Sequence, residues 1–353
     1  MNHIYHISIL WGSDGFGKWL WEYILKHFSG KVELTITGRN LEKGQKTAWE
    51  LWAVFVSDNI QAVKDADIVI YATPISFQEK IIWETIEYIK EGAIIADVTS
   101  MKVFPTEVLA KCKKKGVIVI PTHPMFGPYV SSIAGQVVVL TPQEETKLKP
   151  EYMFLKTFLE SQEAKVIETT PLYHDKMMAV VQWLTHFNMF VVGETMKRLQ
   201  FDIEASMDFV SPIYKLMISS VGRYLSQNPQ LYADIQMYNA EVLKVHEVFL
   251  ETSKDFHTAV KEKNIEKFCG DILEARDFLW SENCQEGQEY TDKLIYLLAK
   301  QIEILKEKKG QNIQLKNIYS WEYKTGKLLD FTQKEIFLDD KNIYQISHWE
   351  VLI

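Results

Sequence analysis

Cysteine is scarce in this chain, which has three of these residues in 353, and no two of them lie close together. Cys112, Cys269 and Cys284 therefore form neither the framework of a disulfide-stabilised secreted domain nor a zinc motif with short ligand spacing. Basic residues are also in deficit, since 39 lysines and arginines face 47 acidic residues and the net charge is -8. This balance argues against a protein that wraps nucleic acid through basic patches.

Long apolar runs and targeting segments are missing as well. No hydrophobic stretch reaches the length that spans a bilayer, and the N-terminal MNHIYHISIL has neither a basic start nor a cleavage site. These absences predict a cytoplasmic protein that has no membrane partner. A hydrophobic fraction of 47% beside a charged fraction of 24% indicates folded domains rather than a disordered chain.

Three segments of different character follow one another along the chain. In residues 1–170, short apolar runs alternate with amphipathic helical stretches, which predicts a mostly parallel sheet with helices on both faces. Residues 171–309 have long helical periodicities, and residues 310–353 have the pattern of short strands with turns at Thr325-Gly326 and Asp339-Asp340. We therefore expect a Rossmann-type α/β domain, an all-α substrate and dimerisation domain, and a small β-rich C-terminal extension that packs on the helices or pairs across a dimer.

A glycine-rich loop, GSDGFG, follows the first predicted strand and precedes a helix. Gly12 and Gly17 have the spacing of the outer glycines in a dinucleotide-binding loop, but Asp14 occupies the place of the middle glycine and Gly15 follows it. We expect Gly12, Gly15, Phe16 and Gly17 to bind a nucleotide, with the N–H groups near Gly15 facing the pyrophosphate. Asp14 is expected to turn away and cap the helix that follows.

The end of the second predicted strand bears on the identity of that nucleotide. An acidic residue that binds the ribose of NAD is expected there, whereas this chain has Thr37, Gly38 and Arg39. A guanidinium pairs bidentately with phosphate oxygens, so Arg39 suits the 2′-phosphate of NADP. NADP is the preferred cofactor and NAD the alternative; a solvated surface arginine is the ordinary explanation of the same residue.

Polar residues also stand where two further strands of the predicted sheet end. Ser100 and Lys102, in the segment ADVTSMK, follow one of these strands, and His123, between Pro121 and Pro124, follows another. A stiffened histidine at the mouth of an α/β crevice is suited to act as a general base. A histidine that caps a strand through backbone hydrogen bonds is the structural alternative.

The helical segment carries a second histidine and two cations of interest. His186 lies in a nearly apolar helix, where a satisfied core histidine is the common case. Lys215 and Arg223 are eight residues apart and so lie on roughly one helix face, where they can clamp a dicarboxylate. Two solvated cations would show the same spacing, but the small and apolar neighbours of Arg223 favour a partly buried, paired arginine.

Taken together, these segments resemble the prephenate dehydrogenases, and the archaeal branch above all. The resemblance covers about residues 4–300 and rests on six segments in order and with suitable spacing: GSDGFGKW, DVTSMK, THPMFGP, QWLTHF, SPIY and VGRYLSQNPQLYADI. It implies a Rossmann-type domain followed by an all-helical dimerisation domain, and a homodimer. The implied activity is the NAD(P)-dependent oxidative decarboxylation of prephenate to 4-hydroxyphenylpyruvate, a step of tyrosine biosynthesis.

The resemblance also implies roles for individual residues. His123 matches the catalytic histidine that contacts the 4-hydroxyl group of prephenate, and Ser100 matches a serine that orients this histidine and the substrate. Lys102 matches a lysine near the same pocket. His186 matches a histidine associated with substrate binding, and Arg223 matches the arginine that holds a prephenate carboxylate.

The chain departs from the family pattern in several places. Lys215 stands where some bacterial members have an arginine, Ala233 where other members have one, and Asp14 where the loop has its middle glycine. We keep Lys215 as a substrate-binding candidate without a bidentate contact. No chorismate mutase segment precedes the domain, and the tail is short for an amino-acid-sensing domain, so we expect a monofunctional enzyme. We also expect no metal site.

Three alternatives remain open from the sequence. An arogenate dehydrogenase would share the fold and the chemical step. A β-hydroxyacid dehydrogenase would share the architecture but would leave the motif around His123 unexplained. An NADP-binding sensor would have no use for a base facing an arginine clamp, and the set formed by Ser100, His123, His186 and Arg223 therefore favours an enzyme.

Overall fold

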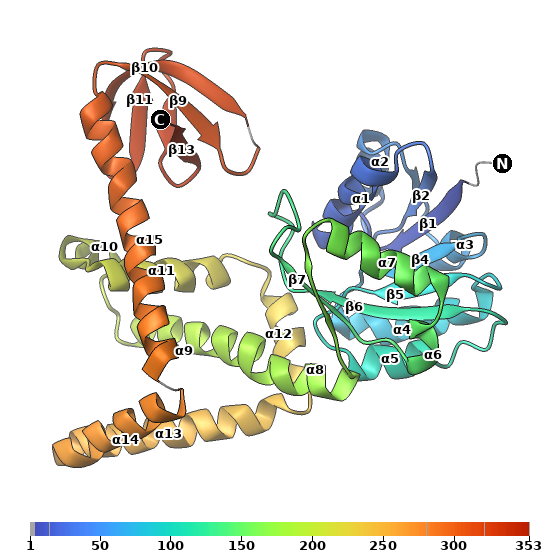
Figure 1. Cartoon of the computed structure of the whole chain (residues 1–353), viewed down its shortest axis with the longest axis horizontal. Coiled ribbons are helices and arrows are strands. Elements are labelled where there is room, and N and C mark those ends of the chain that lie inside the picture. Colours follow the sequence, from blue (N-terminus) through green and yellow to red (C-terminus); the bar gives the residue numbers. More distant parts are fainter. Residues whose placement is uncertain (1–3, 14, 280, 321, 353) are drawn as a thin grey trace. The chain divides into compact units, whose positions relative to one another are not determined.

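The computed structural model describes residues 4–13, 15–279, 281–320 and 322–352 (Figure 1). Contacts divide the chain into two compact units, Met1–Phe249 and Leu250–Ile353. The division falls inside helix α13 (Val242–Glu262). The bounds 1–170, 171–309 and 310–353 stay predictions.

An eight-stranded sheet forms the first part of unit one, in the order β3-β2-β1-β4-β5-β6-β7-β8. Neighbouring strands run parallel except β6 and β7. The first six strands have the order of dinucleotide-binding folds, with the topological switch point between β1 and β4, so the predicted Rossmann-type domain is confirmed. The strands are β1 (Tyr5–Leu10), β2 (Val32–Ile36), β3 (Val54–Phe55), β4 (Ile68–Tyr71), β5 (Ile94–Asp97), β6 (Ile118–Pro124), β7 (Val137–Leu140) and β8 (Lys165–Glu168).

Helices cover the sheet because its strands are apolar on both faces. In β1, Ile7 and Ile9 pack in a core with Trp21, whereas Leu10 points into a separate core with Ile82. Such two-sided burial is typical of parallel sheets. The helices are α1 (Gly15–Phe28), α2 (Leu41–Glu50), α3 (Asn59–Val63), α4 (Ile75–Thr85), α5 (Val103–Leu109), α6 (Glu144–Lys147) and α7 (Pro150–Ser161).

The rest of unit one is helical in its described residues, as predicted. The long periodic stretch after residue 173 is not one helix, because a π-helical segment, Ala179–Leu184, separates α8 from α9. Gln236 donates from Nε2 to the Trp183 carbonyl within this segment at 3.0 Å. The α-helices are α8 (Pro171–Met178), α9 (Thr185–Arg198), α10 (Ile203–Ser206), α11 (Pro212–Leu225), α12 (Pro229–Met237) and the first part of α13.

Unit two contains the remainder of α13, helices α14 and α15, and an antiparallel sheet of order β12-β11-β10-β9-β13. Leu305 of α15 is fully buried in a core shared with Leu315 and Leu328 of the sheet. This confirms the predicted β-rich extension, which packs on a helix. The elements are α14 (Ile265–Phe278), α15 (Ser281–Lys308), β9 (Asn312–Asn317), β10 (Tyr323–Phe331), β11 (Glu335–Leu338), β12 (Ile343–Gln345) and β13 (Trp349–Leu352).

One of the two predicted turns in this sheet is wrong. Thr325 and Gly326 lie inside β10 and pair with β9. A Cβ at Gly326 would come within 2.9 Å of Asp339 Oδ1, so this glycine permits close packing rather than a turn. The turn at Asp339 and Asp340 is confirmed and joins β11 to β12.

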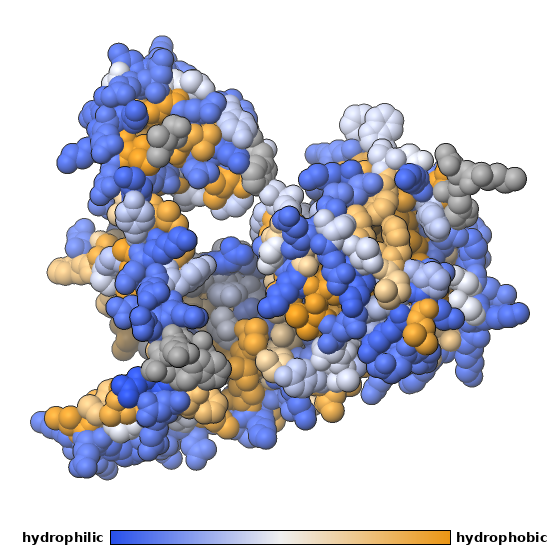
Figure 2. Space-filling view, viewed as in Figure 1, coloured by the Kyte–Doolittle hydropathy of each residue, from blue (hydrophilic) through white to orange (hydrophobic). Residues whose placement is uncertain are grey.

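The surface is mostly hydrophilic, with hydrophobic side chains exposed on several helices (Figure 2). Phe209, Met237, Ile265 and Phe278 are each more than two-thirds exposed in the single chain. Over the part of the chain that the structure describes, no helix combines the length and the hydropathy needed to cross a bilayer.

Candidate active site

The glycine loop between β1 and α1 is tightly packed at two of its glycines and open at the third. A Cβ at Gly12 would lie 2.8 Å from Ile36 Cγ2, and a Cβ at Gly17 would lie 2.7 Å from the Trp11 carbonyl oxygen. Gly15 begins α1 with a φ of +53° and faces open space. The loop therefore packs against β1 and β2 and leaves room above Gly15. Asp14 lies outside the described residues, and its predicted cap with it.

Arg39 follows β2 and lies against two aromatic rings. Its guanidinium is 4.8 Å from the centroid of Trp11 and 5.6 Å from that of Phe77, at distances suited to cation–π contact. Trp11 adopts a φ of 70°, which is uncommon outside glycine, and its N–H donates to Thr37 Oγ1 at 3.0 Å. The exposed Arg39 is thus held beside the glycine loop, at the carboxyl ends of β1 and β2.

Lys102 is completely buried between β5 and β6. Its ammonium donates to the Asp97 carboxylate and, at 2.7 Å, to the Thr122 carbonyl. Burial lowers the pKa of Lys102, and the Asp97 charge opposes this shift. The ammonium is therefore engaged inside the protein. Ser100, two residues before Lys102, is half-buried in the turn after β5.

His123 lies in β6 near its carboxyl end, as predicted, and is buried. Its Nδ1 is 2.8 Å from Nε2 of His174, and Nδ1 of His174 is 2.7 Å from Oδ1 of Asp175. Burial first, and then the neighbouring imidazole of His174 and the charge of Lys102, hold the pKa of His123 well below its usual range. The imidazole of His123 is therefore neutral at physiological pH and can accept a hydrogen bond from a substrate.

Sequence reasoning missed His174 and Asp175, although the pair opens the helical segment. They belong to α8, 51 residues after His123. Asp175 accepts hydrogen bonds from the backbone N–H of Lys102 at 2.8 Å and of Val103 at 2.9 Å. An acidic residue next to a histidine at the start of a helix was the available signal, and sequence spacing alone does not show which strand it meets.

Two carboxylates from the helical half cap two helices of the sheet domain. Asp175 caps α5, and Asp234 of α12 accepts from the Ser76 N–H at 3.1 Å and from Ser76 Oγ at 2.7 Å at the start of α4. Within the described residues, neither α4 nor α5 has a capping side chain at its own N-cap position. Unsatisfied N–H groups at a helix start require such partners, so the helical half completes both helices.

His186 is buried in α9 between two tyrosines. Its ring centroid is 4.9 Å from that of Tyr224 and 4.9 Å from that of Tyr232. Burial lowers the pKa of His186 to about 4, and its Nδ1 has no hydrogen-bond partner among the described residues. A buried, unpaired ring nitrogen suits a ligand contact.

Arg223 and Lys215 lie on α11, and both are exposed in the single chain. The expectation of a partly buried arginine is therefore wrong for the single chain. The small and apolar neighbours of Arg223 reflect packing elsewhere on the helix, where Val221 is the buried residue. Arg223 nevertheless lies close to Tyr232. Burial raises the pKa of Tyr232 to about 12, and the charge of Arg223 partly opposes this rise.

One apolar cluster joins the region of Lys102 and His123 to the region of His186. It contains Met101 and Met125, which are close in the sequence to Lys102 and His123. It also contains Trp183, which precedes His186 in the chain, and Tyr224 and Tyr232, whose rings contact that of His186. The cluster thus has contributions from both the sheet and the helical half of unit one.

A ring contact joins the glycine loop to the His123 segment. Phe16 is 5.9 Å from Phe126, centroid to centroid, and Phe126 follows His123 by three residues. The structure thus brings the glycine loop, His123 and the histidine of the helical half around one region of unit one. Lys215 has no described contact with this region.

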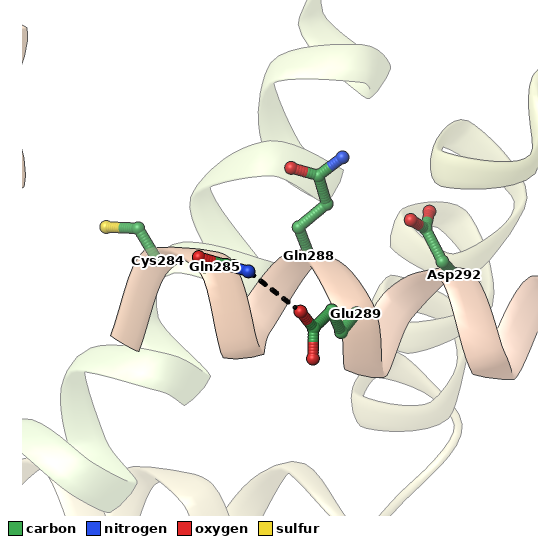
Figure 3. Close-up of a pocket in the computed structure, with 5 residues that line it drawn as sticks. All are labelled: Cys284, Gln285, Gln288, Glu289 and Asp292. Atoms are coloured by element: carbon green, nitrogen blue, oxygen red, sulfur yellow. Dashed lines mark hydrogen bonds between the residues drawn. The ribbon is translucent and has the colours of Figure 1, made fainter. Parts of the chain in front are cut away.

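A separate hollow lies on α15 and contains none of the predicted residues (Figure 3). Most of its lining side chains are of polar types, and Gln285 Nε2 donates to Glu289 one turn further along the helix, at 3.0 Å. All of its residues come from a single helix face: Cys284, Gln285, Gln288, Glu289 and Asp292. This hollow offers no convergent groups for catalysis.

Comparisons with known proteins agree with this organisation. The family model of the prephenate dehydrogenase nucleotide-binding domain matches residues 26–168, and that of the prephenate dehydrogenase dimerization domain matches residues 170–273. The probable arogenate/prephenate dehydrogenase of Methanocaldococcus jannaschii is 42% identical over 333 residues, which are 94% of this chain and 74% of that protein.

Solved structures share the fold at lower identity. Prephenate dehydrogenase from Aquifex aeolicus has a TM-score of 0.59 at 18% identity, over 77% of this chain and 96% of its own. Arogenate dehydrogenase from Synechocystis has a TM-score of 0.53 at 19% identity, over 77% of this chain and 97% of its own. The chain belongs to the prephenate dehydrogenase family, and it is a nicotinamide-dependent oxidoreductase.

Proposed function

We propose that this protein catalyses the NADP-dependent oxidative decarboxylation of prephenate to 4-hydroxyphenylpyruvate, with His123 as the base. The observation that carries the proposal is the placement of His123, which is buried, neutral and fixed through Nδ1 at the end of β6. A general base must be held in one orientation and must be unprotonated before it acts. Family membership supports the class of reaction, and the name of the Methanocaldococcus relative includes both prephenate and arogenate.

Each group of residues has a defined task in this proposal. The nicotinamide, when bound, accepts a hydride from the ring carbon that carries the hydroxyl group. His123 accepts the proton of that hydroxyl group, Ser100 orients the imidazole and the substrate, and His186 and Arg223 bind the substrate, Arg223 through a carboxylate. The cluster around Met101 and Trp183 excludes water, which strengthens these polar contacts. Loss of carbon dioxide then leaves an aromatic ring.

Lys102 has an indirect task in the same proposal. Its ammonium contacts Asp97 and the Thr122 carbonyl, and its N–H donates to Asp175. These contacts support a positioning role between β5, β6 and α8 in place of direct contact with the substrate. Lys215 remains a candidate for a weaker carboxylate contact.

The glycine loop suits the pyrophosphate of a dinucleotide, and an exposed arginine beside it suits the 2′-phosphate of NADP. Gly12 and Gly17 bring the loop against the sheet, Gly15 leaves open space, and Phe16 extends from the loop toward Phe126. Arg39 is exposed at the place where an acid would bind a free ribose. These features support binding of a 2′-phosphate by Arg39.

A steady-state assay tests the function directly. Formation of the reduced nicotinamide is followed with prephenate or arogenate, each with NADP or NAD. We expect the highest kcat/KM with prephenate and NADP. A higher kcat/KM with arogenate would assign the alternative substrate, and no turnover in any of the four combinations would contradict an enzymatic function.

Replacement of Arg39 by alanine is expected to raise the KM for NADP by about 10- to 100-fold, since a charged hydrogen bond contributes about 1.5–3 kcal/mol. The KM for NAD, which lacks the 2′-phosphate, should change by no more than about 3-fold. Lys46→Ala on the neighbouring helix α2 controls for a general loss of positive charge. Equal weakening of both nucleotides in Arg39→Ala would contradict the preference for NADP.

Replacement of Arg223 by alanine is expected to raise the KM for prephenate by about 10- to 100-fold, because one carboxylate loses a charged partner. Lys215→Ala, on the same helix, should raise it by less than about 10-fold, since an ammonium lacks the bidentate geometry. Initial-rate kinetics at saturating NADP measure both values. A larger effect in Lys215→Ala than in Arg223→Ala would reverse the assignment.

We also propose that the active form is a homodimer assembled through the helical segment. The second family model describes a dimerization domain. Large apolar side chains are exposed on the helices of the single chain, among them Met237 and Phe278. Burial of such side chains against a second copy would remove apolar surface from water.

A further inference from the structure

His174 and Asp175 are buried polar residues to which the reaction above gives no task. We propose that they are positioning residues that set the tautomer of His123, so that its Nδ1 carries the proton and its Nε2 presents the lone pair to the substrate hydroxyl. The role as base rests on the proposed function, whereas the tautomer is a property of the protein without substrate.

Each carboxylate oxygen of Asp175 meets a backbone donor. The backbone N–H groups of Lys102 and Val103 can only donate, and they lie 2.8 Å from Oδ1 and 2.9 Å from Oδ2. Both oxygens therefore act as acceptors, as in the ionised carboxylate. Asn239 fixes the backbone of the same residue, because its Nδ2 donates to the Asp175 carbonyl at 3.0 Å.

The proton positions on the two histidines follow from this carboxylate. Nδ1 of His174, 2.7 Å from Asp175 Oδ1, must donate. In a neutral His174 the other nitrogen, Nε2, is then an acceptor. The partner atom 2.8 Å away, Nδ1 of His123, must donate to it, which leaves Nε2 of His123 as the acceptor.

Burial shields this chain of hydrogen bonds from water. His174, Asp175 and His123 are 2%, 3% and 4% exposed, so water does not compete for their polar atoms.

The arrangement also affects the reaction itself. When Nε2 of His123 accepts the hydroxyl proton, the ring becomes an imidazolium whose Nδ1–H already donates to His174. That hydrogen bond strengthens, and the negative charge of Asp175 at the end of the chain stabilises the new positive charge. The same logic applies to the carboxylate that orients histidine in hydrolase triads.

Nitrogen-15 NMR of the histidine-labelled full-length protein, without substrate, tests the tautomer. We expect a protonated Nδ1 and an unprotonated Nε2 for His123, assigned by loss of its signals in His123→Asn. Asp175→Leu should let His123 populate the opposite tautomer as well, since Nδ1 of His174 then has no acceptor and the direction of both hydrogen bonds is no longer fixed. A proton on Nε2 of His123 in the unmodified protein would overturn the proposal.

Kinetics separate positioning from structural support. Asp175→Asn is expected to lower kcat by about 100-fold with the KM for prephenate within about 3-fold, within the range that general-base catalysis contributes. Asp234→Asn is the matched control, because Asp234 also caps a helix from the helical half but contacts Ser76 and Gln230 and neither histidine of the pair. Its kcat should stay within about 3-fold.

A second pair of variants distinguishes the loss of a hydrogen-bond acceptor from a folding defect. His174→Gln keeps an acceptor for His123 Nδ1, whereas His174→Leu does not, so the glutamine variant should retain at least about 10-fold more activity. Equal kcat in these two variants, or an equal loss in Asp175→Asn and Asp234→Asn, would refute positioning. If the protein turned over neither prephenate nor arogenate, the NMR result would still decide the tautomer, so the two proposals fail separately.

Discussion

Replacing His123 by asparagine is expected to lower kcat by about 1000-fold and to leave nucleotide binding almost unchanged. General-base catalysis contributes about 10²- to 10⁴-fold, and an amide cannot accept the hydroxyl proton. The asparagine amide can still donate to His174, so the buried hydrogen bonds beyond it are kept. Initial rates measure kcat, and a fluorescence titration with NADP measures Kd, which should change by less than about 3-fold.

His6→Asn is the matched control for this variant. His6 is exposed in β1, at the opposite end of the sheet from the crevice, and pairs with Glu33 on the surface. Its kcat should equal that of the unmodified protein. Retention of more than about one-tenth of the activity in His123→Asn would remove His123 as the base and would redirect attention to His186.

Replacing Lys102 by methionine is expected to lower the free energy of unfolding by about 3–5 kcal/mol. The change leaves the Asp97 carboxylate buried without its cation, and a buried charge that loses its partner is strongly destabilising. Oδ1 of Asp97 already lacks a hydrogen-bond partner among the described residues. Thermal unfolding should show a Tm lower by about 10 °C.

Two control variants test whether the unpaired buried carboxylate causes this loss of stability. Lys147→Met breaks a surface pair with Glu144, whose side chain is 86% exposed, and should change stability by less than about 1 kcal/mol. Asp97→Asn combined with Lys102→Met removes both charges and should be more stable than Lys102→Met alone. A normal Tm with a raised KM for prephenate in Lys102→Met would instead indicate direct contact with the substrate.

Local patterns predicted most of the architecture. The apolar runs of the first half correspond to β1, β2 and β4 to β8, because strands buried on both faces have a strong local pattern. The two-residue strand β3 and the helix α3 are too short for any periodicity to indicate them. At Gly326 the sequence predicted a turn that does not form. The sequence does not distinguish a glycine that permits close packing from a glycine that permits a turn.

The sequence predicted only part of the candidate site, because some residues that meet there are far apart along the chain. His123 could be placed at a strand end because its own neighbours define that strand. Its partner His174 could not, because 51 residues and a change of fold class separate the two. The aromatic contacts of Arg39 likewise depend on Trp11, whose positive φ has no signature in the sequence.

The π-helical segment before His186 is a further feature that local patterns do not show. Its residues have the same apolar character as a regular helix, and the sequence predicted one. Its Trp183 carbonyl receives a hydrogen bond from Gln236, a residue of α12. Such segments are frequent near functional sites because they displace the side chains that follow, here those of α9.

The caps that Asp175 and Asp234 provide have a consequence for the order of folding. During synthesis the sheet domain leaves the ribosome first, at a stage when α4 and α5 begin without either carboxylate. Each missing cap costs about 1 kcal/mol, so the nascent sheet domain is less stable than the same residues in the finished chain. When α8 and α12 pack on the sheet domain, both helix starts gain their carboxylates and His174 comes to lie against His123. The contacts that complete the fold are therefore coupled to those that fix His123.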